Sequence, residues 1–130
     1  MHTALSALVK NPIAHRGLHD GNEAIFENTR SAFQAAVDLG YAIELDVQLS
    51  SDGKAIVFHD DTLDRLTTLT GPVHDQTAET LGSASIGSGD DTAETLEQIL
   101  QFVAGRVPIV IELKENGERN SALAADVARC

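Results

Sequence analysis

The sequence predicts an α/β fold built on parallel β-strands, because strand-like and helix-like segments alternate along its 130 residues. Short, apolar segments at 12–17, 41–49 and 107–114 are predicted buried strands, and amphipathic segments at 28–40 and 92–105 are predicted helices. Polar clusters lie at the C-terminal ends of the predicted strands, which is typical of the site-bearing edge of α/β barrels and open α/β sheets. We therefore expect at most three parallel strands, with a site at one edge of the sheet.

The first predicted helix, residues 28–40, has start and stop signals as well as an apolar face. Asn28 or Thr29 can cap its N-terminus, and Gly40 is suited to end it. The side chains at helical spacing on its apolar face are Phe33, Ala36 and Val37. This pattern predicts a helix that packs on the sheet between the first two strands.

An Asp-Gly pair lies between two extended segments and is the strongest short-range signal for a β-hairpin in the chain. If Asp52 and Gly53 form a two-residue turn, counting back along both strands places Asp46 opposite His59. This register predicts that a distant imidazole reaches the acidic residues of the strand at 41–49, although a single β-bulge would shift it.

The rest of the chain adds one more strand, an insertion and a final helix. Segment 107–114 is almost continuously apolar, which predicts a strand covered on both faces. Residues 64–92 are polar and rich in turn residues, with at most one short helix at about 75–81. The tail at 121–130 begins a helical pattern. We therefore expect a single domain over residues 1–130, with an insertion at about residues 60–92.

Composition and charge restrict the classes of partner. The 9 basic and 20 acidic residues give a formal net charge of −11, which argues against nucleic-acid binding because phosphate backbones favour a basic surface. Cys130 is the only cysteine, so no intrachain disulfide can form, as fits a reducing compartment. The apolar stretch at 4–9 is too short for a secretory signal, and no segment approaches the ~20 apolar residues of a transmembrane helix. We expect a cytoplasmic protein.

Acidic residues on two predicted strands suggest a metal site. Glu44 and Asp46 lie two residues apart on a strand, so both carboxylates face the same side, where they either share a proton or bind a divalent cation. Glu112, on the strand at 107–114, can supply a third oxygen ligand. Carboxylates without a cysteine cluster suit a hard cation, Mg²⁺ or Ca²⁺. The alternative is that these acidic residues form an exposed face of a two-sided strand.

His15, Arg16 and Lys114 add groups that suit a phosphate ester. The guanidinium of Arg16 offers a planar set of donors to phosphate oxygens, and Lys114 adds a point charge beside Glu112. Histidine exchanges protons near neutral pH, so His15 and His59 can act as base and acid. A single histidine at a strand end is more often structural, whereas two histidines that meet one carboxylate cluster favour catalysis.

Several short motifs occur in a fixed order: HRG at 15–17, ENT at 27–29, ELDVQLSSDG at 44–53, VFHD at 57–60, TLEQIL at 95–100 and IELK at 111–114. As an ordered set over residues 13–114, they resemble the N-terminal part of the glycerophosphodiester phosphodiesterases. The resemblance implies a TIM (β/α)₈-barrel of the phosphodiesterase type, of which this chain holds about the first three parallel strands, a β-hairpin and a small insertion. It also implies metal-dependent hydrolysis of glycerophosphodiesters to glycerol 3-phosphate and an alcohol.

The same resemblance implies a role for each residue of the motifs. The implied acid/base pair is His15 and His59. The implied ligands of the divalent cation, Mg²⁺ or Ca²⁺, are Glu44, Asp46 and Glu112. The implied phosphate-binding residues are Arg16 and Lys114. Glu27 is a weaker candidate near the site, and Asn28 is expected to cap the helix. In this family the substrate's own glycerol hydroxyl is thought to attack phosphorus, which gives a cyclic phosphate that water then opens.

Two features depart from the family pattern. The family has proline before its EN pair where this chain has Phe26. A (β/α)₈-barrel takes about 250 residues, and three parallel strands cannot close one. We therefore expect a piece of a longer enzyme or a partial barrel completed by another chain, with self-association through open sheet edges.

Two other functions remain open at this stage. A related barrel phosphodiesterase, of the phosphatidylinositol-cleaving or phospholipase D-like type, would share the two histidines, but such proteins are typically secreted and carry disulfides. An inactive, truncated barrel that binds only metal or phosphate is the non-enzymatic alternative.

Overall fold

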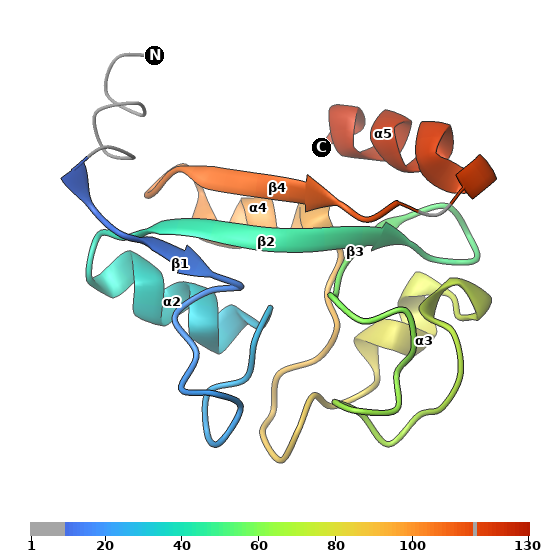
Figure 1. Cartoon of the computed structure of the whole chain (residues 1–130), viewed down its shortest axis with the longest axis horizontal. Coiled ribbons are helices and arrows are strands. Elements are labelled where there is room, and N and C mark those ends of the chain that lie inside the picture. Colours follow the sequence, from blue (N-terminus) through green and yellow to red (C-terminus); the bar gives the residue numbers. More distant parts are fainter. Residues whose placement is uncertain (1–9, 116) are drawn as a thin grey trace.

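The computed structural model describes residues 10–115 and 117–130 and contains a mixed, four-stranded open sheet (Figure 1). Its strands are β1 (Ile13–His15), β2 (Ala42–Leu49), β3 (Ala55–Val57) and β4 (Ile109–Leu113). Its α-helices are α2 (Arg30–Asp38), α3 (Ala78–Gly82), α4 (Leu96–Val103) and α5 (Asn120–Arg129). Short 3-10 helices occupy Val73–Asp75 and Gly117–Arg119. The apolar stretch at 4–9 lies outside the described residues.

Strand β2 is central because it pairs with each of the other three strands. It is parallel to β1, with Ile13 beside Ala42, and parallel to β4, with Asp46 beside Glu112. Strand β3 is antiparallel to the end of β2, and because β4 already occupies one edge of Val47, β3 follows β1 along the other edge. The three parallel strands expected from the sequence are therefore observed.

The hairpin between β2 and β3 has a three-residue turn that starts at Ser51, so the predicted two-residue turn is wrong. The carbonyl of Asp46 accepts a hydrogen bond from the backbone of Phe58 at 3.1 Å, one residue short of His59. The turn is closed locally by the Gly53 N–H, which donates to the carbonyl of Ser50 at 3.2 Å, and Gly53 has a φ of 79°. Outside the hairpin, the Ser51 N–H donates to the carbonyl of Gln76 at 2.8 Å. A slip of one residue changes the face on which every later side chain of a strand lies.

The main core lies between one face of the sheet and helices α2, α4 and α5. The aliphatic residues of β2 that face this core are Ile43, Leu45, Val47 and Leu49. Phe33 of α2, Ile99 of α4 and Leu123 of α5 pack in the same cluster. By the two-residue period of a strand, the polar residues of β2 lie on the opposite face, which these helices do not cover.

Strands β1 and β4 are more exposed than the sequence predicts. The side chains of Ile13, Val110 and Leu113 are 47%, 41% and 41% exposed. The expectation of buried strands at 12–17 and 107–114, the second covered on both faces, is therefore wrong. Within the described residues β1 and β4 are edge strands, so only β2 flanks each of them, and helices α2, α4 and α5 pack on a single face of the sheet.

Helix ends follow local capping chemistry. Thr29 is the N-cap of α2, where its hydroxyl accepts the N–H of Ala32 at 3.3 Å. Helix α4 starts later than predicted because Thr95 and Gln98 form a capping box, which fixes the first helical residue at Leu96. Both predicted long helices are present with shorter ends.

The segment at 60–92 forms a second apolar cluster, which covers the other face of β3. The short helix predicted at about 75–81 appears as α3. Phe26 packs against this cluster, and its ring lies so close to Gly87 that a Cβ there would come within 2.2 Å of it. The residue that departs from the family pattern thus joins the loop before α2 to the insertion. In the described part of the chain, none of the helices has the length and apolar character needed to cross a bilayer.

Candidate functional site

Three carboxylates gather on the face of the sheet opposite helices α2, α4 and α5, where β1, β2 and β4 meet. Glu44, Asp46 and Glu112, which we call the carboxylate cluster, each place one oxygen within 4.8 Å of the others. The parallel pairing brings Asp46 beside Glu112 and His15 beside Glu44. Sequence reasoning placed these four residues at one edge of the sheet, and the structure brings them together.

Asp46 is the buried member of the carboxylate cluster, with no exposed surface. Its Oδ2 accepts a hydrogen bond from the amide of Asn28 at 3.1 Å. Its Oδ1 is buried and has no hydrogen-bond partner among the described residues. A buried carboxylate oxygen without a partner costs free energy, and a divalent cation bound by three carboxylates would satisfy it. The residues present therefore fit a hard cation.

Electrostatic repulsion in the carboxylate cluster perturbs Glu44. Burial and the charge of Asp46 raise the pKa of Glu44, and a hydrogen bond with Glu112 acts in the same direction. The N–H of Arg16 and the charge of His15 oppose the shift. A bound cation would relieve the same repulsion by keeping all three carboxylates ionised.

Two basic side chains flank the carboxylate cluster at distances longer than a hydrogen bond or at its limit. Arg16 places Nε 3.5 Å from Oδ2 of Asp46, and its backbone N–H donates to Glu44 at 3.2 Å. Lys114 places Nζ 4.0 Å from Oδ1 of Asp46 and 3.9 Å from Glu112. Arg16 has a positive φ of 60°, which turns the chain directly after β1.

Gly17 explains how the chain continues from Arg16 toward α2. A Cβ at Gly17 would lie 2.7 Å from the Cβ of Ala32, and its φ is +80°. Glycine alone fits this close approach, so the HRG motif fixes Arg16 between the strand and the helix.

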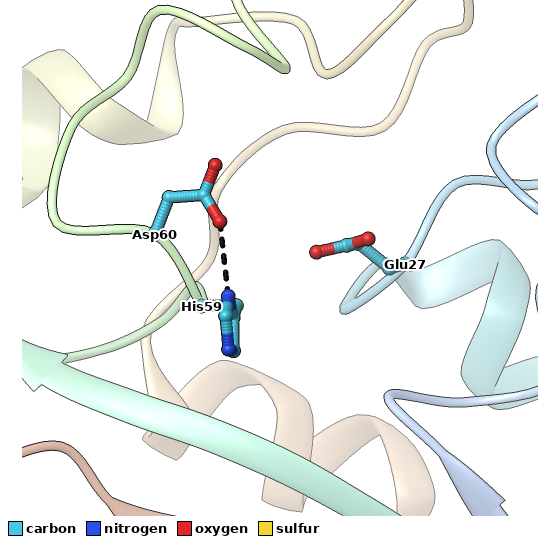
Figure 2. Close-up of side chains that lie close together, drawn as sticks. All are labelled: Glu27, His59 and Asp60. Carbon is cyan, nitrogen blue, oxygen red and sulfur yellow. Dashed lines mark hydrogen bonds and ion pairs between the residues drawn. The ribbon is translucent and has the colours of Figure 1, made fainter.

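A second cluster lies beside the first and contains Glu27, His59 and Asp60, which Figure 2 shows approaching one another from two different loops. Nδ1 of His59 lies 2.9 Å from Oδ1 of Asp60. Arg65 donates to Asp60 at 2.8 and 3.0 Å and to Glu27 at 2.7 and 3.3 Å. Arg16 donates to Glu27 at 3.1 Å. We call this group, with Arg65, the arginine-bridged cluster.

The charges of the arginine-bridged cluster are strongly coupled. Hydrogen bonds from Arg65 lower the pKa of Asp60 to about 2, against burial, with a further contribution from His59. Burial alone would raise the pKa of Glu27, but hydrogen bonds from Arg65 and Asn22 outweigh it and lower the pKa. The pKa of the Arg65 guanidinium is raised in turn, chiefly by Asp60 and Glu27. The carboxylates of Asp60 and Glu27 and the guanidinium of Arg65 are therefore ionised at neutral pH.

The structure separates the predicted site residues into two adjacent groups. Six of the seven are on or beside the carboxylate cluster, whereas His59 lies with Glu27 and Asp60. The predicted pairing of His59 with Asp46 is wrong, because the hairpin register is one residue different. The expectation that Asn28 caps the helix is also wrong, since Thr29 does so and Asn28 holds Asp46.

Sequence reasoning missed three residues that shape the site. Gln48, buried on β2, donates its side-chain amide to the carbonyls of Phe58 and Asp60 at 2.9 and 2.7 Å, and so holds the backbone on both sides of His59. The other two are Asp60 and Arg65, which link His59 to Glu27. The signal that could have identified Gln48 is its place in the polar alternation with Glu44 and Asp46.

Comparison with known proteins agrees with this arrangement. The model of the glycerophosphoryl diester phosphodiesterase family matches residues 15–128. The chain belongs to this family. A glycerophosphodiester phosphodiesterase from Bacillus altitudinis is 42% identical over 108 residues, which cover 78% of this chain and 43% of that protein.

Solved structures of the family show the same fold. A phosphodiesterase from Oleispira antarctica, in complex with the product sn-glycerol-3-phosphate, aligns with a TM-score of 0.85 and 29% identity over 97% of this chain and 53% of that one. The glycerophosphodiester phosphodiesterase from Agrobacterium tumefaciens aligns with a TM-score of 0.75 and 33% identity over 92% and 52%. The chain thus spans about half the length of these relatives and has the α/β architecture of a TIM-barrel-type phosphodiesterase domain. Members of the family are generally metal-dependent.

Proposed function

We propose that this chain carries the metal- and phosphate-binding half of a glycerophosphodiester phosphodiesterase, which hydrolyses glycerophosphodiesters to glycerol 3-phosphate and an alcohol. The observation that carries the proposal is the buried Oδ1 of Asp46, which has no hydrogen-bond partner within residues 10–115 and 117–130. It lies between Glu44 and Glu112, with Arg16 and Lys114 beside them. Acidic ligands and basic neighbours at one point suit a divalent cation and the phosphate that it binds. Membership of the family supports the reaction class.

The residues of the site have separate tasks in the proposed reaction. Glu44, Asp46 and Glu112 would hold Mg²⁺ or Ca²⁺, which when bound stabilises charge on the phosphoryl oxygens. The guanidinium of Arg16 and the ammonium of Lys114 bind the phosphate oxygens and orient phosphorus for attack.

His15 and His59 move the protons. One histidine takes the proton from the glycerol hydroxyl as its oxygen attacks phosphorus, and the other donates a proton to the oxygen of the departing alcohol. A cyclic phosphate of glycerol results. In the second step the histidine that donated takes a proton from water, which attacks phosphorus, and the first histidine returns its proton to the glycerol oxygen. The products are glycerol 3-phosphate and the alcohol, and both histidines end as they began.

The test is hydrolysis of glycerophosphocholine by this chain with Mg²⁺ or Ca²⁺, measured as glycerol 3-phosphate released. We expect turnover that stops in excess EDTA and falls by about 10²-fold or more in His15→Ala and in His59→Ala. Full turnover in EDTA would refute the metal role, and wild-type turnover in either histidine variant would refute its role as acid or base. His74→Ala, which changes a partly exposed histidine in the insertion, is the matched control and should leave turnover unchanged.

A competing proposal is that this chain binds the cation but does not hydrolyse glycerophosphodiesters, and that its copies associate through the edges of the sheet. The exposed Ile13, Val110 and Leu113 on β1 and β4 favour it. Light scattering coupled to size exclusion would detect the association, and calorimetric cation binding without glycerol 3-phosphate release would establish the inactive form.

A further inference from the structure

The contacts of Arg65, Asp60 and Glu27 take no part in the proposed proton transfers, yet they converge on His59. We propose that Asp60 is a positioning residue for His59: it accepts the Nδ1 hydrogen of the ring and leaves Nε2 as the atom that exchanges protons. The inference deepens the proposed function and rests on it for the reaction, whereas the state of the ring can be measured without any reaction.

The first support is the contact between the two side chains. Nδ1 of His59 and Oδ1 of Asp60 are 2.9 Å apart, a hydrogen-bond distance, and Figure 2 shows the imidazole directed at that carboxylate. An ionised carboxylate can only accept a hydrogen bond, so the proton of this contact must lie on Nδ1. In the neutral ring Nε2 then carries a free lone pair, as a general base requires.

The second support is that Asp60 is itself fixed. Arg65 donates from Nε to Oδ2 at 2.8 Å and from Nη2 to Oδ1 at 3.0 Å, a two-point contact that sets the plane of the carboxylate. The other side of Arg65 is held by Glu27, which is 3% exposed. The carboxylate that orients His59 is therefore linked through Arg65 to Glu27, a buried side chain in the loop before α2.

The third support is the clamp on the backbone of His59. Gln48 of β2 donates to the carbonyls of the residues before and after it, Phe58 and Asp60, at 2.9 and 2.7 Å. The backbone and the ring of His59 are therefore held by separate contacts. Fixing both restricts the ring to one orientation, which proton transfer to and from a bound substrate requires.

A cation site at Glu27, His59 and Asp60 is the alternative use of the same atoms, since one ligand atom of each lies within 4.8 Å of the others. Arg16 and Arg65 already donate to these carboxylates at 2.7 to 3.3 Å. A divalent cation would have to displace or repel both guanidinium groups. The charge already present therefore favours the positioning role.

The experiment is long-range proton–nitrogen NMR of the imidazole rings in the full chain, at a pH where His59 is neutral. We expect His59 to show a protonated Nδ1 and an unprotonated Nε2. Asp60→Ala should lose the protonated Nδ1 signal, because a free imidazole in water favours the proton on Nε2. The matched control is Asp61→Ala, which removes an exposed carboxylate one residue further along and should leave the His59 signals unchanged.

Several outcomes would overturn the proposal. A neutral His59 ring with its proton on Nε2 in the wild-type chain would by itself refute the proposal, and this measurement does not depend on the folding of a variant. A protonated Nδ1 that persists in folded Asp60→Ala would also refute it. Displacement of the His59 signals by Mg²⁺ or Ca²⁺ in Asp46→Asn, whose carboxylate cluster is disabled, would assign His59 to a cation site instead.

Rescue by a conservative variant separates positioning from general stability. Asp60→Glu keeps an acceptor for the ring and should restore part of the protonated Nδ1 signal that Asp60→Ala loses. A chain that does not hydrolyse glycerophosphocholine would defeat the proposed function but leave the NMR result intact, so the two failures are distinguishable.

Discussion

The carboxylate cluster and the arginine-bridged cluster are adjacent, and both meet the geometric requirement for a metal site. They differ in how their charge is neutralised. In the arginine-bridged cluster both oxygens of Glu27 and of Asp60 accept hydrogen bonds from arginine. In the carboxylate cluster Asp46 Oδ1 has no hydrogen-bond partner in the described chain, and Lys114 Nζ is 4.0 Å away. Proximity of ligand atoms identifies both clusters, but among the described residues only the carboxylate cluster has a buried oxygen that a bound cation would satisfy.

Arg16 connects the two clusters and takes a different part in each. Its Nη1 donates to Glu27 at 3.1 Å, while its Nε lies 3.5 Å from Asp46 without a hydrogen bond. One end of the guanidinium is thus anchored, and the other faces the proposed phosphate site. The arginine-bridged cluster can therefore orient Arg16, a side chain that the proposed site at the carboxylate cluster needs.

The largest expected effect comes from removing the anchor of the arginine-bridged cluster. Glu27→Ala leaves Arg16 and Arg65 without their shared acceptor, and the loss of one partner from a buried ion pair costs about 3 kcal/mol of unfolding free energy. Urea unfolding measures the loss. Glu23→Ala, which removes an exposed acid from the same loop, is the control and should cost little. A cost below that of the control would mean that the arginines find other acceptors.

Cation binding should stabilise the chain through the carboxylate cluster alone. A cation at about 100 times its Kd adds about 2.7 kcal/mol to the free energy of unfolding. We expect Mg²⁺ or Ca²⁺ to raise the Tm of the wild-type chain and of Glu27→Gln, and not to raise that of Asp46→Asn. The reverse pattern, with the shift kept in Asp46→Asn and lost in Glu27→Gln, would exchange the roles of the two clusters.

Acid should act on the two clusters with opposite signs. The pKa of Asp60 is lowered to about 2. Ionised Asp60 therefore stabilises the fold fully at pH values above the ordinary pKa of an aspartate, and this stabilisation is lost as the pH falls toward 2. The expected loss is about 1–2 kcal/mol after allowance for solvent screening. The pKa of Glu44 is raised, so its effect is a penalty that is relieved as the pH falls.

Unfolding curves between pH 6 and pH 2, without added cation, would measure this difference. Asp60→Asn should flatten the acid loss, whereas Glu44→Gln should raise stability at neutral pH and leave the acid loss in place. An acid loss that is unchanged in Asp60→Asn would show that other carboxylates cause it.

The sequence was sufficient for features that depend on local periodicity. The two-residue period of β2 places Glu44 and Asp46 on one face, and the position of Glu112 in its strand brings it beside Asp46 in the parallel register. Apolar residues at helical spacing located both long helices. Asn28 and Thr29 both suit the N-cap of the first, and only the fold shows that Thr29 is used. These features need no knowledge of distant contacts.

Features that depend on distant contacts could not be read from the sequence. The hydrogen bond from the Ser51 N–H to the carbonyl of Gln76 joins the hairpin turn to the insertion. The arginine-bridged cluster depends on Arg65 reaching Glu27 across 38 positions. The exposure of β1 and β4 depends on which strands lie beside them rather than on their own composition. Each of these outcomes is set by a partner that local patterns do not identify.

The smallest expected effect comes from a variant that tests whether the two-point contact of the Arg65 guanidinium holds Asp60. Arg65→Lys keeps the charge but loses the planar two-point contact, which costs about 0.5–1 kcal/mol at a partly exposed site. Arg30→Lys is a matched control, since Arg30 makes a similar two-point contact with Glu94 and the two side chains are 44% and 47% exposed.

Both variants should lose similar stability, but only Arg65→Lys should raise the pKa of Asp60, measured by NMR titration of its carboxyl carbon. A lysine ammonium cannot meet both oxygens of Asp60 while reaching Glu27, so the ionised form of Asp60 loses a donor. An unchanged Asp60 titration in Arg65→Lys would mean that His59 alone holds this carboxylate. In that case His59 would orient the Asp60 carboxylate, which is the opposite of the role that we infer for Asp60.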